Sequence, residues 1–474
     1  MPKISLIWQN TAISSTATAV QGVANLVTVI YLARVLQPMS YGIFSYTWAI
    51  IGVVSILTYL GIPPLLTRQL SRAKDHSPVI TYGISLTGLL SITVTMAFII
   101  GTWTVPGLDR YRLAFDVWAA TVFFNGITPR WIFSGVQRLW IPSIGDMVGA
   151  MVRLGLTILL VHGPHDLVPA IGVTVFSIGM PILGELIWLR CLLPFRLSWV
   201  SWHQGYDTIR KGVPLGITAF VGVLYSGLDT WILHIFVGSR AVGLYSAAYR
   251  PVVFLSTFSA IYFNLTYPVL SRLTVQDKPL TQRVIRLAGL SILALVVPMG
   301  VGTDVVAGPL MRQAFGQQYA ASGLVLAVLI WSWGFGILRD TFSTTLIAGN
   351  REVVFARIFA VAGAINAGLM FYLVRWGPVG TAAALVITQA LLLVLSILAV
   401  RRITPHPIDF KGHGGYFAKI ILNSLVMGVC VWLVRPHVSV EVDILVGIAL
   451  YAGLTWLTKA VPWREVLATV RMAP

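Results

Sequence analysis

Charged side chains are scarce in this sequence: Asp, Glu, Lys and Arg make up 10% of the 474 residues, whereas hydrophobic residues make up 57%. Soluble domains carry about 25% charged residues, and surface-to-volume scaling prevents a soluble chain of this length from burying nearly all of its apolar residues. The scarcity of charge therefore excludes a water-soluble globular protein and a disordered chain. Only two cysteines are present, Cys191 and Cys430, which excludes a disulfide framework. The composition predicts an integral membrane protein.

Acidic residues are scarcer than basic ones: 16 Asp and Glu stand against 33 Lys and Arg, a formal net charge of +17. In a soluble protein this balance would suggest a nucleic-acid partner. In a membrane protein it is typical of cytoplasmic loops rich in Lys and Arg, so we expect no nucleic-acid partner. The first apolar segment runs uncharged from Ile4 to Ala33, which is too long for the core of a cleavable signal, and we expect it to remain as a span.

Motifs of metal and nucleotide chemistry are also missing. The sequence contains no HExxH, no paired-cysteine motif and no Walker-type glycine-rich loop. We therefore expect no metal site, no ATP hydrolysis and no cofactor, apart from H⁺ or Na⁺ as a candidate coupling ion.

Long uncharged apolar runs are what the sequence has instead. A helix needs about 20 apolar residues to cross the hydrocarbon layer of a bilayer, and a β-barrel would show alternating stretches of about ten residues. We therefore predict an all-α polytopic membrane protein. The fourteen predicted spans lie near residues 12–33, 41–64, 79–101, 113–133, 144–163, 168–189, 213–236, 244–270, 285–305, 320–347, 353–374, 378–400, 415–434 and 442–461.

The orientation of these spans follows from the Lys and Arg residues of the short loops. With the N-terminus inside, the predicted cytoplasmic loops hold 22 of these residues, the outer loops hold 7, and four arginines remain within spans. We predict that both termini face the cytoplasm.

An internal repeat relates the two halves of the chain. Gly42-Ile43-Phe44-Ser45 follows the first span and Gly243-Leu244-Tyr245-Ser246 follows the seventh, while Leu70-Ser71-Arg72 and Leu270-Ser271-Arg272 close the second and eighth. The spacing predicts two pseudo-symmetric six-helix lobes of parallel topology. The expected parts are an N-terminal lobe at 1–190, a cytoplasmic linker at 191–212, a C-terminal lobe at 213–402, two additional helices at 415–461 and a cytoplasmic tail at 462–474.

Four short motifs resemble those of a known family. After the first span stands Ala33-Arg34-Val35-Leu36-Gln37-Pro38 with Tyr41-Gly42, similar to the family pattern R-x-L-G-P-x-x-Y-G, although Gln37 replaces the usual glycine. The other motifs are Asp229 with Val242-Gly243-Leu244-Tyr245-Ser246-Ala247-Ala248, Phe315-Gly316 with Tyr319-Ala320-Ala321-Ser322, and Gly377-Pro378-Val379-Gly380-Thr381-Ala382-Ala383. Over residues 5 to 400 the chain resembles the Wzx-type oligosaccharide flippases of the multidrug/oligosaccharidyl-lipid/polysaccharide exporter superfamily.

This resemblance implies two bundles of six helices around a central cavity lined mainly by spans 1, 2, 7 and 8. It also implies movement of a polyprenyl-pyrophosphate-linked oligosaccharide from the cytoplasmic to the outer leaflet by alternating access. The expected location is the cytoplasmic (inner) membrane of a bacterium or archaeon, and the expected partners are membrane lipids and polysaccharide polymerase or export machinery. The motifs identify the superfamily better than the substrate.

Two charged residues lie within predicted spans, where a charge is energetically unfavourable. A charge inside a span costs about 2.5–3.5 kcal/mol on insertion scales and normally faces a cavity or a partner. We expect Asp229 in span 7 and Arg250 in span 8 to lie at matching depth in the membrane. Arg250 would bind an anionic head group through its planar guanidinium while Asp229 holds or releases it. A permanent structural ion pair between the two helices is an equal alternative.

Other ionisable residues of the spans are further candidates. Arg153 lies near mid-membrane, and Arg130 and Arg339 lie in the cytoplasmic third, where snorkelling or structural pairing competes with ligand contact. Arg34 closes the first span at the outer face. These four residues complete the set of candidate substrate-binding side chains, and the candidates for ion coupling are Asp229, Asp340 and Glu185.

Three alternatives remain. A membrane polysaccharide polymerase or glycosyltransferase would place catalytic residues on a sizeable outer loop, whereas the predicted outer loops are short. We therefore expect no enzyme. A drug/cation antiporter of the same superfamily would favour acidic groups in its cavity, whereas the spans hold Arg130, Arg153, Arg250 and Arg339, which suit anionic cargo. A flippase of a lipid-linked peptidoglycan precursor shares the fourteen spans and stays open.

Overall fold

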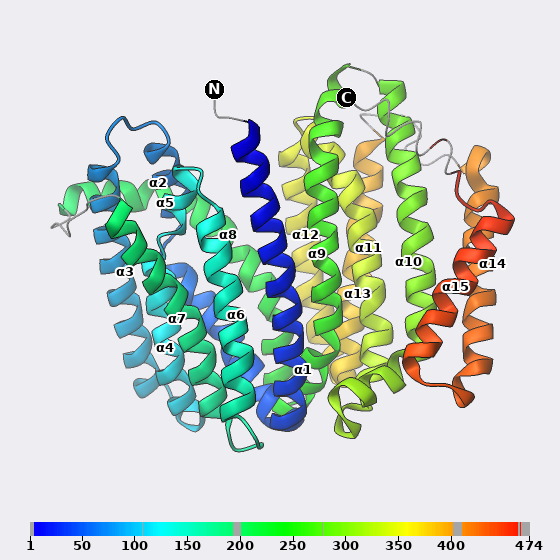
Figure 1. Cartoon of the computed structure of the whole chain (residues 1–474), viewed down its shortest axis with the longest axis horizontal. Helices are drawn as coiled ribbons and strands as arrows, with labels where there is room; N and C mark the ends of the chain where they lie inside the picture. The colour runs from blue at the N-terminus through cyan, green and yellow to red at the C-terminus, as the bar shows by residue number, and fades with distance from the viewer. Residues whose placement is uncertain are drawn as a thin grey trace. The chain divides into compact units, whose positions relative to one another are not determined.

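A computed structural model describes residues 4–106, 108–192, 201–276, 278–401 and 410–462, together with residue 465. Within these residues every regular element is a helix (Figure 1), which confirms the all-α fold predicted for a polytopic membrane protein. The chain divides into two compact units, Met1–His234 and Ile235–Pro474. Residues 193–200 of the expected linker and most of the expected tail lie outside the described residues.

The first unit contains eight α-helices and one short 3₁₀ turn, η1 (Asp109–Tyr111), in its described part. The α-helices are α1 (Ile4–Leu57), α2 (Ile62–Leu70), α3 (Ser77–Thr104), α4 (Arg112–Ile127), α5 (Arg130–Gly135), α6 (Trp140–Leu160), α7 (Leu167–Leu192) and α8 (Trp202–Phe236), the last of which ends at the division between the units.

The second unit contains seven α-helices and three 3₁₀ turns in its described part. They are α9 (Ser239–Gln276), α10 (Lys278–Phe315), η2 (Gln317–Tyr319), α11 (Ser322–Ala348), α12 (Glu352–Leu373), η3 (Val374–Trp376), α13 (Gly377–Val400), α14 (Phe410–Val434), η4 (Arg435–His437) and α15 (Val440–Thr458).

Nine helical stretches of the described residues are long and apolar enough to cross a membrane. Two of them, Ile13–Leu57 and Glu352–Val400, each contain two of the predicted spans, so the nine stretches account for eleven of the fourteen. The other three predicted spans fall on α4 with α5, on α8 and on α9. α8 begins at Trp202, inside the stretch expected to be the linker.

Two predicted spans are interrupted by the backbone. The span predicted at 41–64 ends at Leu57, because Leu60 (φ 41°) and Gly61 (φ 73°) turn the chain before α2 begins. A Cβ atom at Gly61 would lie 2.4 Å from the carbonyl oxygen of Gly212 in α8, so only glycine fits this approach. The span predicted at 113–133 likewise ends at Ile127, and Pro129 stands before the separate helix α5.

The kink of α1 coincides with the first family-like motif. Gln37 has φ 62° and ψ 168°, inside what is otherwise a single 54-residue helix, and Pro38 follows it. Because proline has no N–H to donate and restricts the residue before it, the helix axis breaks at this point. The φ/ψ region that Gln37 occupies is favourable almost only for glycine.

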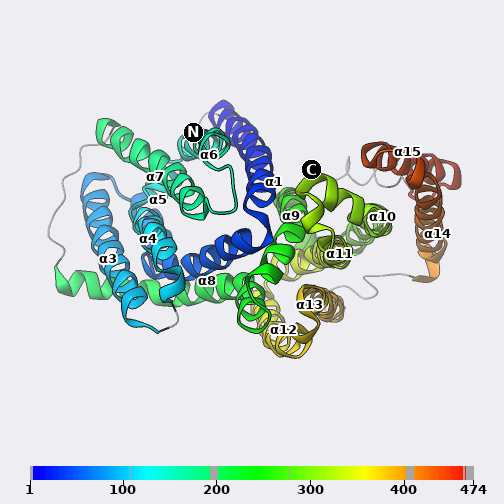
Figure 2. The same cartoon turned by 90° about the horizontal axis from the view of Figure 1, so that it is seen from below.

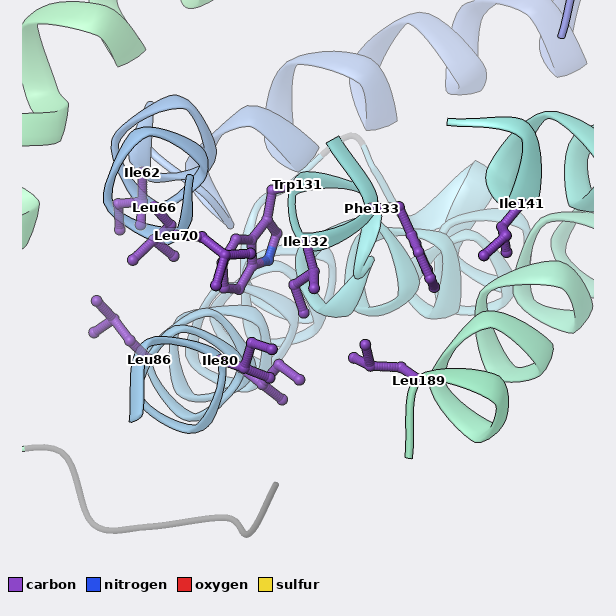
Figure 3. Close-up of a cluster of buried hydrophobic side chains, with 11 residues drawn as sticks. Ile62, Leu66, Leu70, Ile80, Leu86, Trp131, Ile132, Phe133, Ile141 and Leu189 are labelled. Atoms are coloured by element: carbon purple, nitrogen blue, oxygen red, sulfur yellow. The ribbon is translucent and has the colours of Figure 1, made fainter. Parts of the chain in front are cut away.

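The core of the first unit includes a cluster where α2 and α5 cover the ends of the longer helices. α2 packs on α5 and α3, and Trp131, Ile132 and Phe133 of α5 meet side chains of α3, α6 and α7 (Figure 3). The members of this cluster are Ile62, Leu66, Leu70, Ile80, Ile84, Leu86, Trp131, Ile132, Phe133, Ile141 and Leu189. The longer helices pack as α1 on α6, α6 on α7, and α4 on both α3 and α7.

The second unit is built around α11. This helix packs against α9, α10 and α13, and 61% of the residues in its most apolar 18-residue stretch are buried. α12 lies on α13 (Figure 2), where the Oγ1 hydroxyl of Thr388 donates to Oδ1 of Asn366 over 2.8 Å. α14 and α15 pack on each other and on α10.

Candidate functional site

One group of ionisable side chains in the first unit joins three helices. Arg130 of α5 forms an ion pair with Asp146 of α6, and both charges act electrostatically on Glu185 of α7. The side chains of Arg130 and Asp146 are 45% and 24% exposed, whereas Glu185 is 3% exposed. The sequence named Arg130 and Glu185 as separate candidates, and the structure brings them into one group, which we call the α5–α7 charge cluster: Arg130, Asp146 and Glu185.

Close helix packing buries Glu185. Gly145 and Gly149 lie one turn apart on α6 and face Pro181 and Ser177 of α7. A Cβ atom at Gly149 would lie 2.6 Å from the carbonyl oxygen of Ser177, and one at Gly145 would lie 3.1 Å from Oε1 of Glu185. The absence of side chains at the two glycines lets α7 approach α6 closely enough to bury the carboxyl group.

Arg153 lies two turns further along α6. Its Nη2 donates to the amide oxygen of Asn25 in α1. The side chain is half-buried, and this partner is a neutral amide on a different helix. Sequence reasoning did not single out Asn25, because an uncharged polar residue within a span carries little signal by itself.

Arg339 and Asp340 pair with each other in the second unit. Nη2 of Arg339 lies 2.5 Å from Oδ1 of Asp340, and its Nη1 donates to Oε1 of Gln389 in α13 over 2.8 Å. The two side chains are 16% and 22% exposed. The arrangement supports the structural pairing expected for Arg339. Gln389 lies in a long apolar run, and nothing in the sequence indicated that it would bond to Arg339.

The other predicted site residues lie on α1, α8 and α9. Asp229 of α8 is 6% exposed, and its Oδ1 accepts the backbone N–H of Thr230 over 2.7 Å. Arg250 lies half-buried in α9, and Arg34 is exposed on α1. Asp229 belongs to the first unit and Arg250 to the second. Their expected proximity stays a prediction.

Two further carboxylates were missed by the sequence reasoning. Asp304 stands at the end of a predicted span, but α10 continues to Phe315, so the residue lies within the helix, where Trp331 donates a hydrogen bond to it. Asp443 is 1% exposed in the first turn of α15. An acidic residue in a first helical turn is a recognisable signal, because it complements the helix dipole.

A loop with a hydrogen-bonded carboxylate and a mainly apolar groove are further features of the first unit. The carboxylate of Asp166 accepts hydrogen bonds from the backbone N–H groups of His162 and Gly163 over 2.8 and 2.9 Å, and these two donors hold its pKa below the usual value.

A groove of about 700 Å³ runs between α4 and α7, lined mainly by apolar and glycine residues, with Asp116 at one end. In the described ranges, no three His, Cys, Asp or Glu residues gather to hold a metal ion.

Comparison with known proteins connects this arrangement to a family. The pattern of the family described as polysaccharide biosynthesis protein matches residues 7–274, more than half of the chain. A protein of Escherichia coli strain K12 named as an O-antigen transporter is 22% identical over 79% of this chain and 92% of its own length. Flippase AglR of Haloferax volcanii is 24% identical over 66% of each chain.

Solved structures agree with this assignment at the level of the fold. The inward closed conformation of the lipid II flippase MurJ is similar with a TM-score of 0.73 and 15% sequence identity, over 96% of this chain and 100% of that chain. The relatives that match over most of this chain are themselves named as transporters or flippases. The match over residues 7–274 is the decisive one, and this chain belongs to the polysaccharide biosynthesis protein family.

Proposed function

We propose that this protein is a flippase that moves a polyprenyl-pyrophosphate-linked oligosaccharide from the cytoplasmic to the outer leaflet of the cytoplasmic membrane. The observation that carries the proposal is the family match over residues 7–274. The name of the Escherichia coli relative, which aligns over 79% of this chain, points to the same class of cargo.

The intramembrane arginines support an anionic cargo. A guanidinium stays charged at every physiological pH and binds a phosphate through two parallel hydrogen bonds. The cargo proposed here carries a pyrophosphate, and the substrate-binding candidates Arg250, Arg153 and Arg34 lie on helices of both units. The candidates Arg130 and Arg339 instead pair with the acids Asp146 and Asp340. In this proposal two lobes rock around a cationic cavity, with both termini in the cytoplasm.

The experiment that tests the proposal is depletion of this protein from cells that make the glycolipid. Lipids are extracted and analysed by mass spectrometry after labelling from the outside with a reagent that does not cross the membrane. The proposal expects the complete polyprenyl-pyrophosphate oligosaccharide to accumulate in the cytoplasmic leaflet.

Two other outcomes would redirect the assignment. The fold similarity to the lipid II flippase MurJ makes a peptidoglycan precursor the second candidate cargo, and accumulation of that precursor alone would favour it. An unchanged glycolipid pool would contradict both flippase proposals and leave a drug/cation antiporter as the next function to test.

A further inference from the structure

The carboxyl group of Glu185 is buried within the first unit. The residue is 3% exposed, and neither Oε1 nor Oε2 has a hydrogen-bond partner among the described residues. A charged carboxylate left in this way costs several kcal/mol. Something must therefore neutralise it in the state that the structure shows.

The neighbouring charges leave this carboxyl in excess. Arg130 is the only ionisable residue of α5, and it is already paired with Asp146 of α6. The pair is neutral as a whole, so Glu185 carries the third charge of the cluster. The carboxylate of Asp146 repels a negative charge on Glu185 and does not compensate it.

No other described element packed against α7 supplies a compensating charge. Arg153, the other ionisable residue of α6, bonds to Asn25. α1 and α4 also pack on α7. The single charged residue of α1 is Arg34, and α4 has Arg112 and Asp116 in its first two turns, at the end remote from Glu185. On α7 itself, Arg190 is exposed.

A proton fits this place better than a metal cation. Hard cations such as Na⁺ and Ca²⁺ are held by several oxygen ligands together, whereas a proton needs one. No group of three metal-binding side chains exists in the described residues, and a guanidinium beside the carboxyl would repel a bound cation.

We propose that Glu185 is a proton-binding site whose occupancy decides whether Arg130 pairs with Asp146 or with Glu185. With the acid protonated, Arg130 pairs with Asp146, as it does in the structure. When the proton passes to water, the new carboxylate attracts Arg130 away from Asp146. This inference rests on the proposed flippase function, for which it supplies the coupling ion.

The elements around the cluster are suited to such an exchange. Asp146 follows Gly145 directly in the chain, and a Cβ atom at Gly145 would lie 3.1 Å from Oε1 of Glu185, so both acids lie within one small region of the α6–α7 interface. α5 has six residues and is separated from α4 by Pro129 and from α6 by Gln137 at φ 57°. The exposed part of Arg130 connects the cluster to water.

The test is infrared difference spectroscopy on the purified full-length protein, titrated with pH in the absence of any glycolipid. A protonated carboxyl has a C=O stretching band that a carboxylate lacks. We expect wild type to lose one such band as pH rises, and Glu185→Gln to lack that band at every pH. Glu352→Gln, which changes an exposed glutamate of α12, is the matched control and should keep it.

A second variant separates the exchange from a simple buried acid. Asp146→Asn leaves Glu185 as the only carboxylate for Arg130, so the band should disappear at the pH where wild type still shows it. Identical spectra of wild type and Glu185→Gln would overturn the proton site. An unchanged band in Asp146→Asn would overturn the exchange. This variant also provides the test if Glu185→Gln fails to fold.

The coupling itself is measured apart from proton binding. Cells carrying Glu185→Gln should show glycolipid export that no longer changes with external pH, whereas export by wild type changes. If wild-type cells show no glycolipid dependence on this protein, the flippase proposal fails while the infrared result stands. If export by Glu185→Gln follows pH as wild type does, the coupling role of Glu185 is wrong.

Discussion

Single residues of this protein carry conformations and charges that their neighbours enforce. Gln37 occupies a backbone region that favours glycine, at the kink where the family-like motif has glycine. Asp166 is stabilised by two backbone donors, whereas Glu185 has no donor in the part of the chain that the structure describes. The sequence showed that Gln37 replaces the glycine of the motif, and it showed the ionisable residues. It did not show which ionisable side chains are hydrogen-bonded, because the donors come from other segments of the chain.

Replacing Gln37 with glycine should stabilise the protein. Strain of this kind costs about 1–3 kcal/mol. The greater conformational freedom of glycine in the unfolded chain reduces the gain in stability by roughly 0.5–1 kcal/mol. We expect Gln37→Gly to raise the thermal unfolding midpoint of the detergent-solubilised protein and Gln37→Ala to leave it unchanged. A lower midpoint for the glycine variant would show that the backbone at residue 37 is not strained.

The Asp166 carboxylate should make the stability of its loop depend on acid pH. Its folded-state pKa lies below the ordinary value of 3.8. Its contribution is therefore complete above pH 3.8 and disappears as pH falls through the lower folded-state pKa. We expect thermal unfolding midpoints measured through this acid range to fall more steeply in wild type than in Asp166→Asn. Parallel curves would contradict the assigned hydrogen bonds.

The helices show how far hydropathy predicts membrane-spanning elements. Eleven predicted spans lie in long apolar helices, because every backbone group in the hydrocarbon layer must be bonded within its own segment. Hydropathy did not place the breaks at Gly61 and Pro129, which both fall inside predicted spans. Nor did it place the end of α10, which continues beyond the predicted limit to Phe315.

The break between α1 and α2 should tolerate no side chain at residue 61. In Gly61→Ala the new Cβ atom would lie 2.4 Å from backbone atoms of Gly212 and Gly216 at a positive φ. Overpacking costs about 1–3 kcal/mol and the backbone strain about 1–3 kcal/mol more. We expect a lower unfolding midpoint and less protein in the membrane. Gly88→Ala, where nothing lies within 4 Å, should match wild type.

At the scale of the whole molecule, the sequence predicts two related halves and a family, and the match over residues 7–274 confirms the family. The repeat and the lobe boundaries stay predictions, as does the proximity of Asp229 and Arg250, which belong to different units. The identity of the saccharide has no motif, because a cavity selects a sugar by shape and hydrogen bonding from many segments.

Removal of the Arg250 side chain should abolish export. If its guanidinium binds the pyrophosphate, Arg250→Ala should reduce glycolipid in the outer leaflet to the level of depleted cells, and Arg250→Lys should restore only part of it, because an ammonium lacks the bidentate fork. Arg312→Ala, at an exposed position of α10, is the control. Full export by an Arg250→Ala protein that inserts normally would remove Arg250 from the site.

The sequence by itself determined that this chain is a multi-pass all-α membrane protein with basic loops, because bilayer thickness and the cost of charge act on each segment separately. It also carried motifs typical of the family to which the chain belongs. Only the tertiary structure decided which charges meet: Arg130 with Asp146, Arg153 with Asn25, and Glu185 with no hydrogen-bond donor among the described residues. The physical reason is that these contacts depend on the register between helices, which is set by the glycines and prolines where helices approach closely.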